Sequence, residues 1–182
     1  TRHWLAAIAA AVQEAARHLP EGRGLRILEI GGGTAGLSAH LLPLLGRGLH
    51  AYIFTDVSAS FFPNAHQKLA AFPEVECRIF DLEKPGPDQD LHAESFDLII
   101  GTNVLHAVND VCTALRHLHE LLAPGGTLVF MDTATPQLWT ETVFGLTSGW
   151  WRFTDRDLRP DQPLLDRAQW ERVLTQAGFG EV

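Results

Sequence analysis

The sequence predicts an α/β fold, a doubly wound and mostly parallel Rossmann-like sheet with helices on both of its faces. Two observations indicate it. Apolar segments with the character of strands alternate with helical patterns along the 182 residues, without internal repeats, and such alternation is typical of parallel sheets. At residues 27–36 (ILEIGGGTAG), an apolar strand runs through three glycines into a helix, which is the arrangement of a nucleotide-type binding loop.

Three helices and three strands are expected in the first half of the chain. An apolar stripe at helical spacing predicts the first helix, and Gly46 ends the second. Ser58 caps the third, which tolerates Pro63 in its first turns. These predicted elements are a helix at 3–19, a strand at 25–30, a helix at 34–45, a strand at 49–55, a helix at 58–72 and a strand at 75–80.

The second half of the chain continues the alternation. A polar loop rich in proline, glycine and aspartate, residues 83–95, comes before the fourth strand. The turn at residues 124–126 closes the next helix, and residues 148–165 have no period and are expected to be irregular. The predicted elements are a strand at 96–102, a helix at 107–122, a strand at 127–132 and helices at 137–147 and 166–177.

Composition argues against several kinds of partner and site. The net charge of −8, without a basic run, disfavours nucleic acid and anionic membranes, and no apolar run approaches the roughly 20 residues that span a bilayer. Cys77 and Cys112 are expected to be buried small hydrophobes, which indicates a reducing, cytoplasmic compartment. No metal is expected, because the histidines and cysteines lack a metal-binding spacing.

The glycine loop carries the first candidate binding residues. Gly31, Gly33 and Gly36 fit the G-x-G-x-x-G nucleotide pattern, in which a dinucleotide would place its pyrophosphate on the helix N-terminus. A plain turn between strand and helix is the alternative. Glu29 favours another ligand, because a carboxylate pointing into the crevice would repel pyrophosphate but attract an ammonium or a sulfonium.

Two further carboxylates follow the next strands, where open parallel sheets bind their ligands. Asp56 comes 23 residues after Gly33, at the place where such folds bind ribose hydroxyls; a turn aspartate before Ser58 is the alternative. Asp81 is predicted to accept the amino hydrogens of adenine, with Leu82 supplying an apolar face or a backbone amide. For Asp81 the alternative is a turn that opens the polar loop.

A candidate base follows the fourth strand. His106 is expected at the mouth of the crevice, where a histidine can serve as a general base because an unperturbed imidazole is mostly neutral at physiological pH, while Asn103 could fix a ligand. Asp132 follows the fifth strand, so it would lie within reach of His106 if those strands are neighbours, and would set the imidazole tautomer. The alternatives are structural roles in the turns. Trp150 and Trp151 either line an acyl-binding wall or belong to the core.

Six blocks of the sequence together resemble the methyltransferase domains embedded in modular type I polyketide synthases. The first five are typical of class I S-adenosylmethionine methyltransferases, and the last, together with NVLHA, is specific to the synthase-embedded branch. The blocks are ILEIGGGTAG, YIFTDVS, CRIFDLEK, DLIIGTNVLHAV, LLAPGGTLVFMDT and FGLTSGWWRFTDRDLRPDQPLL. The resemblance covers the chain from about residue 25 onward, and residues 1–182 are expected to form a single methyltransferase domain. The two ends of the sequence favour a piece cut from a larger synthase, without the strand pair that ends the fold.

The resemblance also implies chemistry. S-adenosylmethionine would donate the methyl group, held by Glu29, Gly31, Gly33, Asp56, Asp81, Leu82 and Asn103. An acyl carrier protein would deliver a phosphopantetheine-tethered acyl chain between flanking synthase domains. Carbon-methylating members use a histidine–glutamate pair at the positions of His106 and Asp132. This chain departs from that pattern in the shorter Asp132 and in Ser148, where an acid is expected.

The leading hypothesis is therefore methyl transfer to the α-carbon of a tethered β-ketoacyl intermediate, with His106 as general base and Asp132 orienting it. Methylation of a hydroxyl or enol oxygen by the same pair is the first alternative. A catalytically weakened structural domain is the second, favoured by Asp132 and Ser148. An NAD-dependent oxidoreductase also matches the glycine pattern, but Glu29 and the aromatic block at residues 144–153 argue against it.

Overall fold

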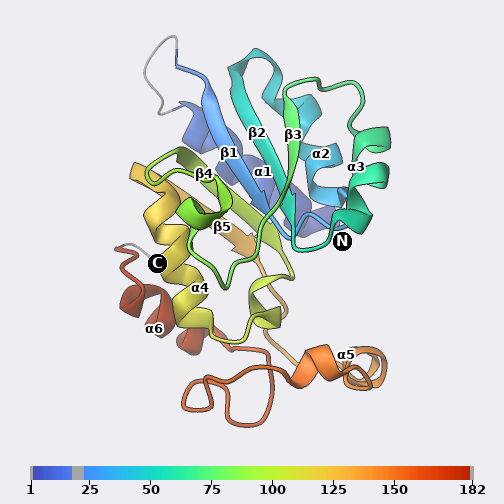
Figure 1. Cartoon of the computed structure of the whole chain (residues 1–182), viewed down its shortest axis with the longest axis vertical. Helices are drawn as coiled ribbons and strands as arrows, with labels where there is room; N and C mark the ends of the chain where they lie inside the picture. Colours follow the sequence, from blue (N-terminus) through green and yellow to red (C-terminus); the bar gives the residue numbers. More distant parts are fainter. Residues whose placement is uncertain (1, 18–22, 181–182) are drawn as a thin grey trace.

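The computed structural model describes residues 2–17 and 23–180, apart from the side chains of Arg2 and Arg47. Five parallel strands form one sheet in the order β3-β2-β1-β4-β5 (Figure 1). The predicted doubly wound α/β fold is thereby confirmed. The strands are β1 (Leu25–Ile30), β2 (Leu49–Asp56), β3 (Val75–Ile79), β4 (Phe96–Thr102) and β5 (Leu122–Met131).

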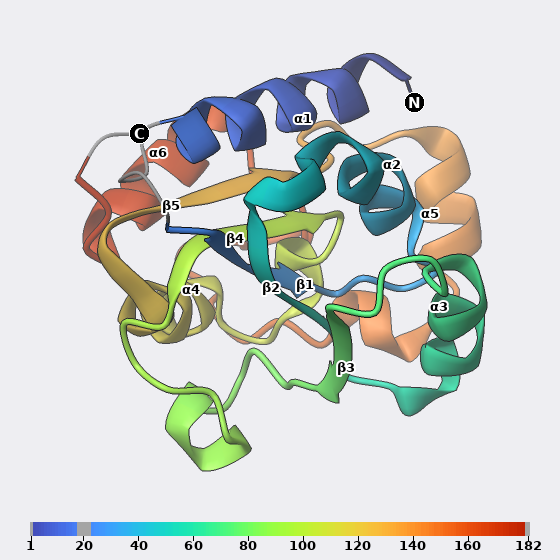
Figure 2. The same ribbon diagram turned by 90° about the horizontal axis from the view of Figure 1, so that it is seen from above.

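Helices cover both faces of this sheet (Figure 2). One buried cluster joins α1, α2 and α3 to one face, and a second joins α4 and α6 to the other. The apolar stripes of these helices supply the core, as expected of amphipathic segments in a layered fold. The helices are α1 (Arg2–Arg17), α2 (Gly36–Leu45), α3 (Phe62–Lys68), α4 (Val111–Leu121), α5 (Leu138–Phe144) and α6 (Arg167–Gln176).

The order of the strands in the sheet determines where a binding crevice can form. The order reverses between β1 and β4, which are neighbours in the sheet although two strands separate them in sequence. The loops that leave β1 and β4 turn to opposite faces and open a crevice at the carboxyl ends of the strands. Figure 1 shows α5 and the segment after it beyond that same edge.

Several element bounds differ from prediction because local chemistry interrupts the helices. The helix expected at 107–122 is a short 3₁₀ turn, η4 (Leu105–Ala107), followed by α4, since Asp110 caps α4 by accepting from the Thr113 N–H at 2.8 Å. The helix expected at 34–45 begins later, because Ala35 has a φ of 57°.

The remaining differences are also local. The helix expected at 58–72 is divided into η2 (Ala59–Phe61) and α3, and α5 ends at Phe144, before the expected 147. β5 begins at Leu122 and contains the glycines that were expected to precede it. The predicted end of the first helix lies outside the described residues. Within residues 2–17 and 23–180, no helix combines the length and apolarity needed to cross a bilayer.

Candidate functional site

The loop after β1 requires glycine at two positions. Gly31 and Gly33 have φ values of 56° and 51°, in the left-handed region that side chains disfavour. A Cβ on Gly31 would also lie 2.4 Å from Cγ2 of Val104. The backbone after β1 is thus packed directly against the loop after β4, and no larger residue fits between them.

Asp56 at the end of β2 holds this glycine loop. Its Oδ2 accepts a hydrogen bond from the Gly33 N–H at 3.0 Å, and its Oδ1 accepts from the Ser58 N–H at 2.9 Å. The contact to Ser58 is the turn that sequence reasoning kept as an alternative. The contact to Gly33 shows a further role, in which one carboxylate joins two strand-end loops.

Five of the predicted binding residues meet at one cavity of about 210 Å³, called here the glycine-loop cavity. Asp81 faces it as the start of a turn, because its Oδ1 accepts from the Glu83 N–H at 3.1 Å. Lys84 Nζ lies 3.2 Å from Oδ2 of the same carboxylate. The lining residues are Gly31, Asp56, Val57, Phe80, Asp81, Leu82, Glu83, Asn103, Val104, Ala107, Val108 and Arg152.

Glu29 does not point into the crevice as the sequence reasoning supposed. Glu29 is 1% exposed. Its carboxylate accepts hydrogen bonds from Ser38 Oγ and, at 2.7 Å, from Tyr52 Oη. Burial raises the pKa of Glu29 to about 7, against the opposing effect of these two hydrogen bonds. The side chain lies between the sheet and α2, beneath the loop.

The structure brings His106 and Asp132 together. Nδ1 of His106 lies 2.5 Å from Oδ1 of Asp132, and the His106 backbone N–H donates to Oδ2 at 3.1 Å. The imidazole is 13% exposed and the carboxylate 1%. A carboxylate that accepts a hydrogen bond from Nδ1 keeps the ring proton on Nδ1. Nε2 then carries the free lone pair with which the imidazole can act as a general base.

Asn103 occupies a strained position between two strand ends. Its φ of 51° is one that asparagine tolerates better than most residues. The backbone N–H donates to the Met131 carbonyl at 2.7 Å, and Oδ1 accepts from Thr133 Oγ1 at 3.0 Å. Asn103 therefore joins the ends of β4 and β5 and lines both cavities of the site.

The second cavity, about 520 Å³, adjoins the first and has a mostly apolar wall; we call it the aromatic cavity. Trp150 lies edge-on to the His106 ring, with centroids 5.5 Å apart, and stacks on Phe144 at 5.7 Å. The lining residues are Val57, Asn103, His106, Ala107, Thr133, Trp139, Thr140, Phe144, Thr147, Gly149, Trp150, Arg152 and Leu164. Trp150 thus lines the wall of a cavity, and binding of an acyl chain by that wall stays a prediction.

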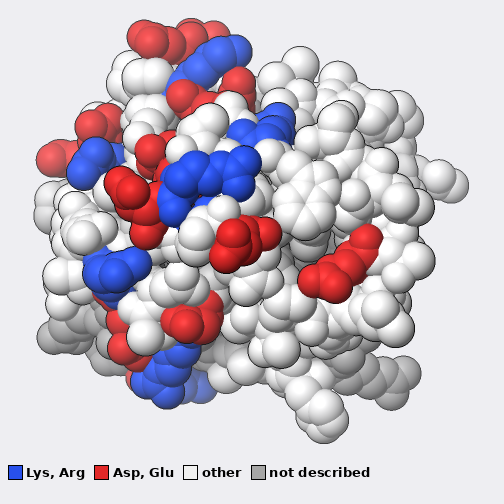
Figure 3. Space-filling model, turned by 90° about the horizontal axis from the view of Figure 1, so that it is seen from below, with Lys and Arg blue, Asp and Glu red and all other residues white. Residues whose placement is uncertain are grey.

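The face around the aromatic cavity carries few charges. Figure 3 shows most of the charged side chains on one half of this side of the molecule and a wide, mostly uncharged area with isolated acidic atoms on the other. Exposed apolar residues of α5 and its neighbourhood contribute to it: Leu138, Trp139, Val143, Phe144 and Leu146. Trp151 is 46% exposed and donates from its indole to the Gly145 carbonyl, so it is not part of the core.

Sequence reasoning missed two arginines. Arg152 borders both cavities and pairs with Glu83 at 2.5 Å. Arg159 is 1% exposed and binds the segment that carries His106. Both lie in the irregular stretch 148–165, where no periodicity predicts which side is buried. The one available signal is the spacing of Asp155 and Arg159, four residues apart.

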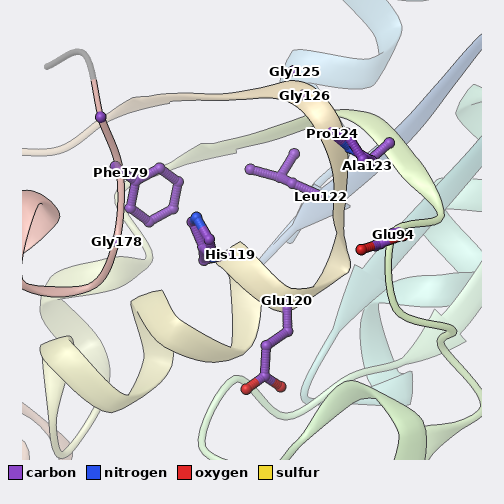
Figure 4. Close-up of a pocket in the computed structure, with 11 residues that line it drawn as sticks. Glu94, His119, Glu120, Leu122, Ala123, Pro124, Gly125, Gly126, Gly178 and Phe179 are labelled. Carbon is purple, nitrogen blue, oxygen red and sulfur yellow. The ribbon is translucent and has the colours of Figure 1, made fainter.

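A separate hollow of about 320 Å³ lies at the amino ends of β4 and β5, on the opposite edge of the sheet. Figure 4 shows the His119 imidazole directed toward Phe179 there, and the two ring centroids are 5.2 Å apart. Pro124 and the glycines after it form its rim. None of the predicted site residues lines this hollow.

The amino-acid sequence matches a known protein family and is similar to known proteins. The family described as "Methyltransferase domain" matches residues 28–128. The highly reducing polyketide synthase pspA of Penicillium soppii is 38% identical over 163 residues, which cover 87% of this chain. The chain spans only 6% of the length of that relative.

Solved structures agree with the sequence relatives. The crystal structure of the CurJ carbon methyltransferase superposes with a TM-score of 0.92 and 40% identity, covering 96% of this chain and 46% of the other. The trans-methyltransferase CalH, solved in complex with SAH, gives a TM-score of 0.86 and 34% identity, covering 93% of this chain and 48% of the other.

Proposed function

Because this chain belongs to the methyltransferase-domain family and is an S-adenosylmethionine-dependent methyltransferase of the type found in polyketide synthases, we propose that it methylates the α-carbon of a β-ketoacyl intermediate tethered to an acyl carrier protein. The observation that carries this proposal is the hydrogen-bonded pair of His106 and Asp132 at the wall of a mostly apolar cavity. That cavity shares Val57, Asn103, Ala107 and Arg152 with the glycine-loop cavity.

The residues that line the glycine-loop cavity support binding of S-adenosylmethionine there. Gly31 lines this cavity and lets the loop after β1 pack directly against Val104, and Asp56 and Asp81 offer carboxylates to hydroxyl and amino groups. Among the described residues, three acids, Asp56, Asp81 and Glu83, line this cavity against one arginine, Arg152. An acidic wall suits a cationic donor better than a pyrophosphate, which supports methyl transfer over nicotinamide chemistry. When bound there, the donor supplies an activated methyl group on a sulfonium. Glu29 would support this site from below, through its contacts to Ser38 and Tyr52.

The His106–Asp132 pair supplies the proton transfer that carbon attack requires. The α-carbon of a β-ketoacyl thioester lies between two carbonyls, so its proton is acidic and the resulting charge is shared by both oxygens. Nε2 of His106 takes the proton, and Asp132 stabilises the imidazolium that forms. The apolar wall of Trp150 and Phe144 holds an acyl chain and excludes water.

Oxygen methylation is the second candidate, since Nε2 would take a hydroxyl proton in the same way. It is favoured by Asp132, which is one methylene shorter than the glutamate expected from the family resemblance. The position of the new methyl group on the product distinguishes carbon methylation from oxygen methylation.

We also infer that the domain works within a longer synthase. The chain spans a small part of its multidomain relatives, so a carrier protein and flanking domains would deliver the acceptor. A carrier-bound substrate should then be methylated faster than the free acid, because tethering raises its effective concentration at the cavity.

The deciding experiment is single-turnover methylation of a carrier-bound β-ketoacyl substrate by the parent and by His106→Ala. Loss of the base should slow the reaction by roughly 10²–10⁴-fold while donor binding stays nearly unchanged. His92→Ala, at an exposed histidine, is the control. Parental rate in His106→Ala would refute the assignment, and NMR of the product locates the methyl group on carbon or oxygen.

A further inference from the structure

We propose that Arg159, with Asp155, is a positioning residue that fixes the catalytic histidine through its backbone carbonyl, in addition to the contacts made by Asp132. Arg159 lies in the irregular segment after α5, outside the sheet and helices. It is nevertheless 1% exposed, and its side chain is fully enclosed. A charged group is costly to bury unless it is paired and hydrogen-bonded, so its contacts indicate what it does.

The guanidinium of Arg159 binds the turn that carries His106. Its Nη1 donates to the His106 carbonyl at 2.9 Å. Its Nη2 donates to the carbonyls of Val108 at 2.9 Å and Asn109 at 3.0 Å. Three of the four residues between His106 and Asn109 are therefore bound to one side chain.

The local backbone explains why arginine stands here. η4 is only three residues long and α4 begins at Val111, so the carbonyls between them lack the partners that a continuous helix would provide. A guanidinium offers five N–H donors in a rigid plane and can serve several carbonyls at once. Lysine, with a single ammonium on a flexible chain, cannot reproduce that geometry.

Asp155 completes the arrangement. Its Oδ1 accepts from Arg159 Nε at 2.6 Å, and its Oδ2 accepts from the Val111 N–H at 3.0 Å, at the start of α4. The carboxylate therefore balances the buried charge and holds the far end of the same turn. Residues 106–111 are bound at both ends by one ion pair.

His106 is consequently held at three points. Asp132 binds its N–H and its imidazole, and Arg159 binds its carbonyl. Rotation of the 105–109 turn would move Nε2 relative to the acceptor, and a displacement of about 1 Å can cost about 10²-fold in rate. The inference rests on the proposed role of His106 and adds a residue that acts on it without touching the substrate.

The test compares Arg159→Gln and Arg159→Lys with Arg156→Gln. Arg156 is a matched control, because it lies on the same segment and over the same Phe153 ring, but its guanidinium donates, among the described residues, to the Pro160 carbonyl and not to the turn that carries His106. In the Arg159 variants we expect kcat with the carrier-bound substrate to fall about 10–10²-fold. The acceptor KM and the calorimetric Kd for S-adenosylhomocysteine should stay within about twofold of the parent.

A second readout follows His106 itself. In protein labelled with ¹⁵N-histidine, the Nδ1 signal should report the hydrogen bond to Asp132 in the parent and in Arg156→Gln. It should shift or broaden in the Arg159 variants, because the turn is released. Should Arg159→Gln fail to fold, Arg159→Lys and Asp155→Asn carry the test, since each keeps part of the network.

The outcomes separate this inference from the proposed function. Parental kcat and an unchanged Nδ1 signal in the Arg159 variants, while His106→Ala is inactive, would overturn the positioning role and leave the function intact. Equal loss of donor binding and of kcat would also overturn it, because that pattern indicates general disruption. An altered Nδ1 signal with an active His106→Ala would instead overturn the proposed base and keep the structural relationship.

Discussion

Asp132 binds His106 with both oxygens of one carboxylate, Oδ1 to Nδ1 at 2.5 Å and Oδ2 to the backbone N–H at 3.1 Å. Its Oδ1 also accepts from the Thr133 N–H at 2.9 Å. A side chain that fixes both the ring and the backbone of its partner leaves the imidazole little freedom to rotate. The arrangement determines the tautomer and the direction of Nε2 together.

Asp132→Asn should therefore slow methylation by about 10–10²-fold, less than loss of the imidazole itself. The amide keeps the size of the side chain but removes the charge that favours a proton on Nδ1. Single-turnover rates at fixed pH measure the effect, with Asp157→Asn, at an exposed aspartate of the 148–165 segment, as the control. A variant as fast as the parent would show that Asp132 has only a structural role.

Gly31→Ala should weaken binding of S-adenosylhomocysteine by at least about 10-fold. Its Cβ would lie 2.4 Å from Val104 Cγ2 at a φ of 56°, and a left-handed residue with a side chain costs about 1–2 kcal/mol before any clash. Displacement of the loop after β4 would then reshape the glycine-loop cavity. Calorimetry of the purified variant provides the measurement.

Gly36→Ala is the control for that substitution. Gly36 is the first residue of α2, has no positive φ, and a Cβ there would meet nothing within 4 Å. We expect the Gly36→Ala variant to bind S-adenosylhomocysteine with the affinity of the parent. Equal weakening by both alanines would mean that the loop responds to any added methyl group and not to the contact with Val104.

The pairing of His106 with Asp132 was predictable because it follows from strand order. β4 and β5 run parallel with Thr102 opposite Met131, so residues that follow the two strands start from adjacent points at one edge of the sheet. The alternation of strands and helices placed both residues at strand ends, and the doubly wound strand order made those two strands neighbours.

Glu29 and Arg159 show why other features were not predicted. Along a strand, side chains alternate between faces, so Glu29 shares a face with Ile27, which lies in the cluster with α1 and α2. The two-residue period of a strand therefore predicts that the Glu29 carboxylate lies on the side of Ser38 and not in the crevice. Arg159 offered only the four-residue spacing from Asp155 as a signal, because the carbonyls that it binds at His106, Val108 and Asn109 lie 50 to 53 residues away in the sequence.

Trp150→Leu should raise the KM for the carrier-bound acceptor about 5-fold and leave donor binding unchanged. Loss of the stacking on Phe144 and of the edge contact to His106 removes aromatic pairing worth about 1 kcal/mol from the wall of the aromatic cavity. Trp151→Leu, at the neighbouring exposed tryptophan, is the matched control. An equal change in both variants would assign the effect to folding of the segment.

The raised pKa of Glu29 should make the protein less stable as the pH rises. Burial raises its pKa in the folded protein to about 7 from an ordinary value of 4.5. Between those values the folded state holds more protons than the unfolded state, so the free energy of unfolding falls as pH rises. The stabilisation is complete below about pH 4.5 and is lost through pH 7, with a total of about 3 kcal/mol at 1.36 kcal/mol for each pKa unit.

Glu29→Gln should remove this dependence, because glutamine resembles the protonated acid and its amide oxygen can still accept from Ser38 and Tyr52. Urea unfolding at pH 5 and pH 8 measures the effect. The parent should lose about 2–3 kcal/mol more than the variant over that interval, whereas Glu74→Gln, at an exposed glutamate, should follow the parent. If the parent and Glu29→Gln lose the same free energy, Glu29 is ionised in the folded protein throughout, and the two hydroxyls of Ser38 and Tyr52 outweigh the burial of its charge.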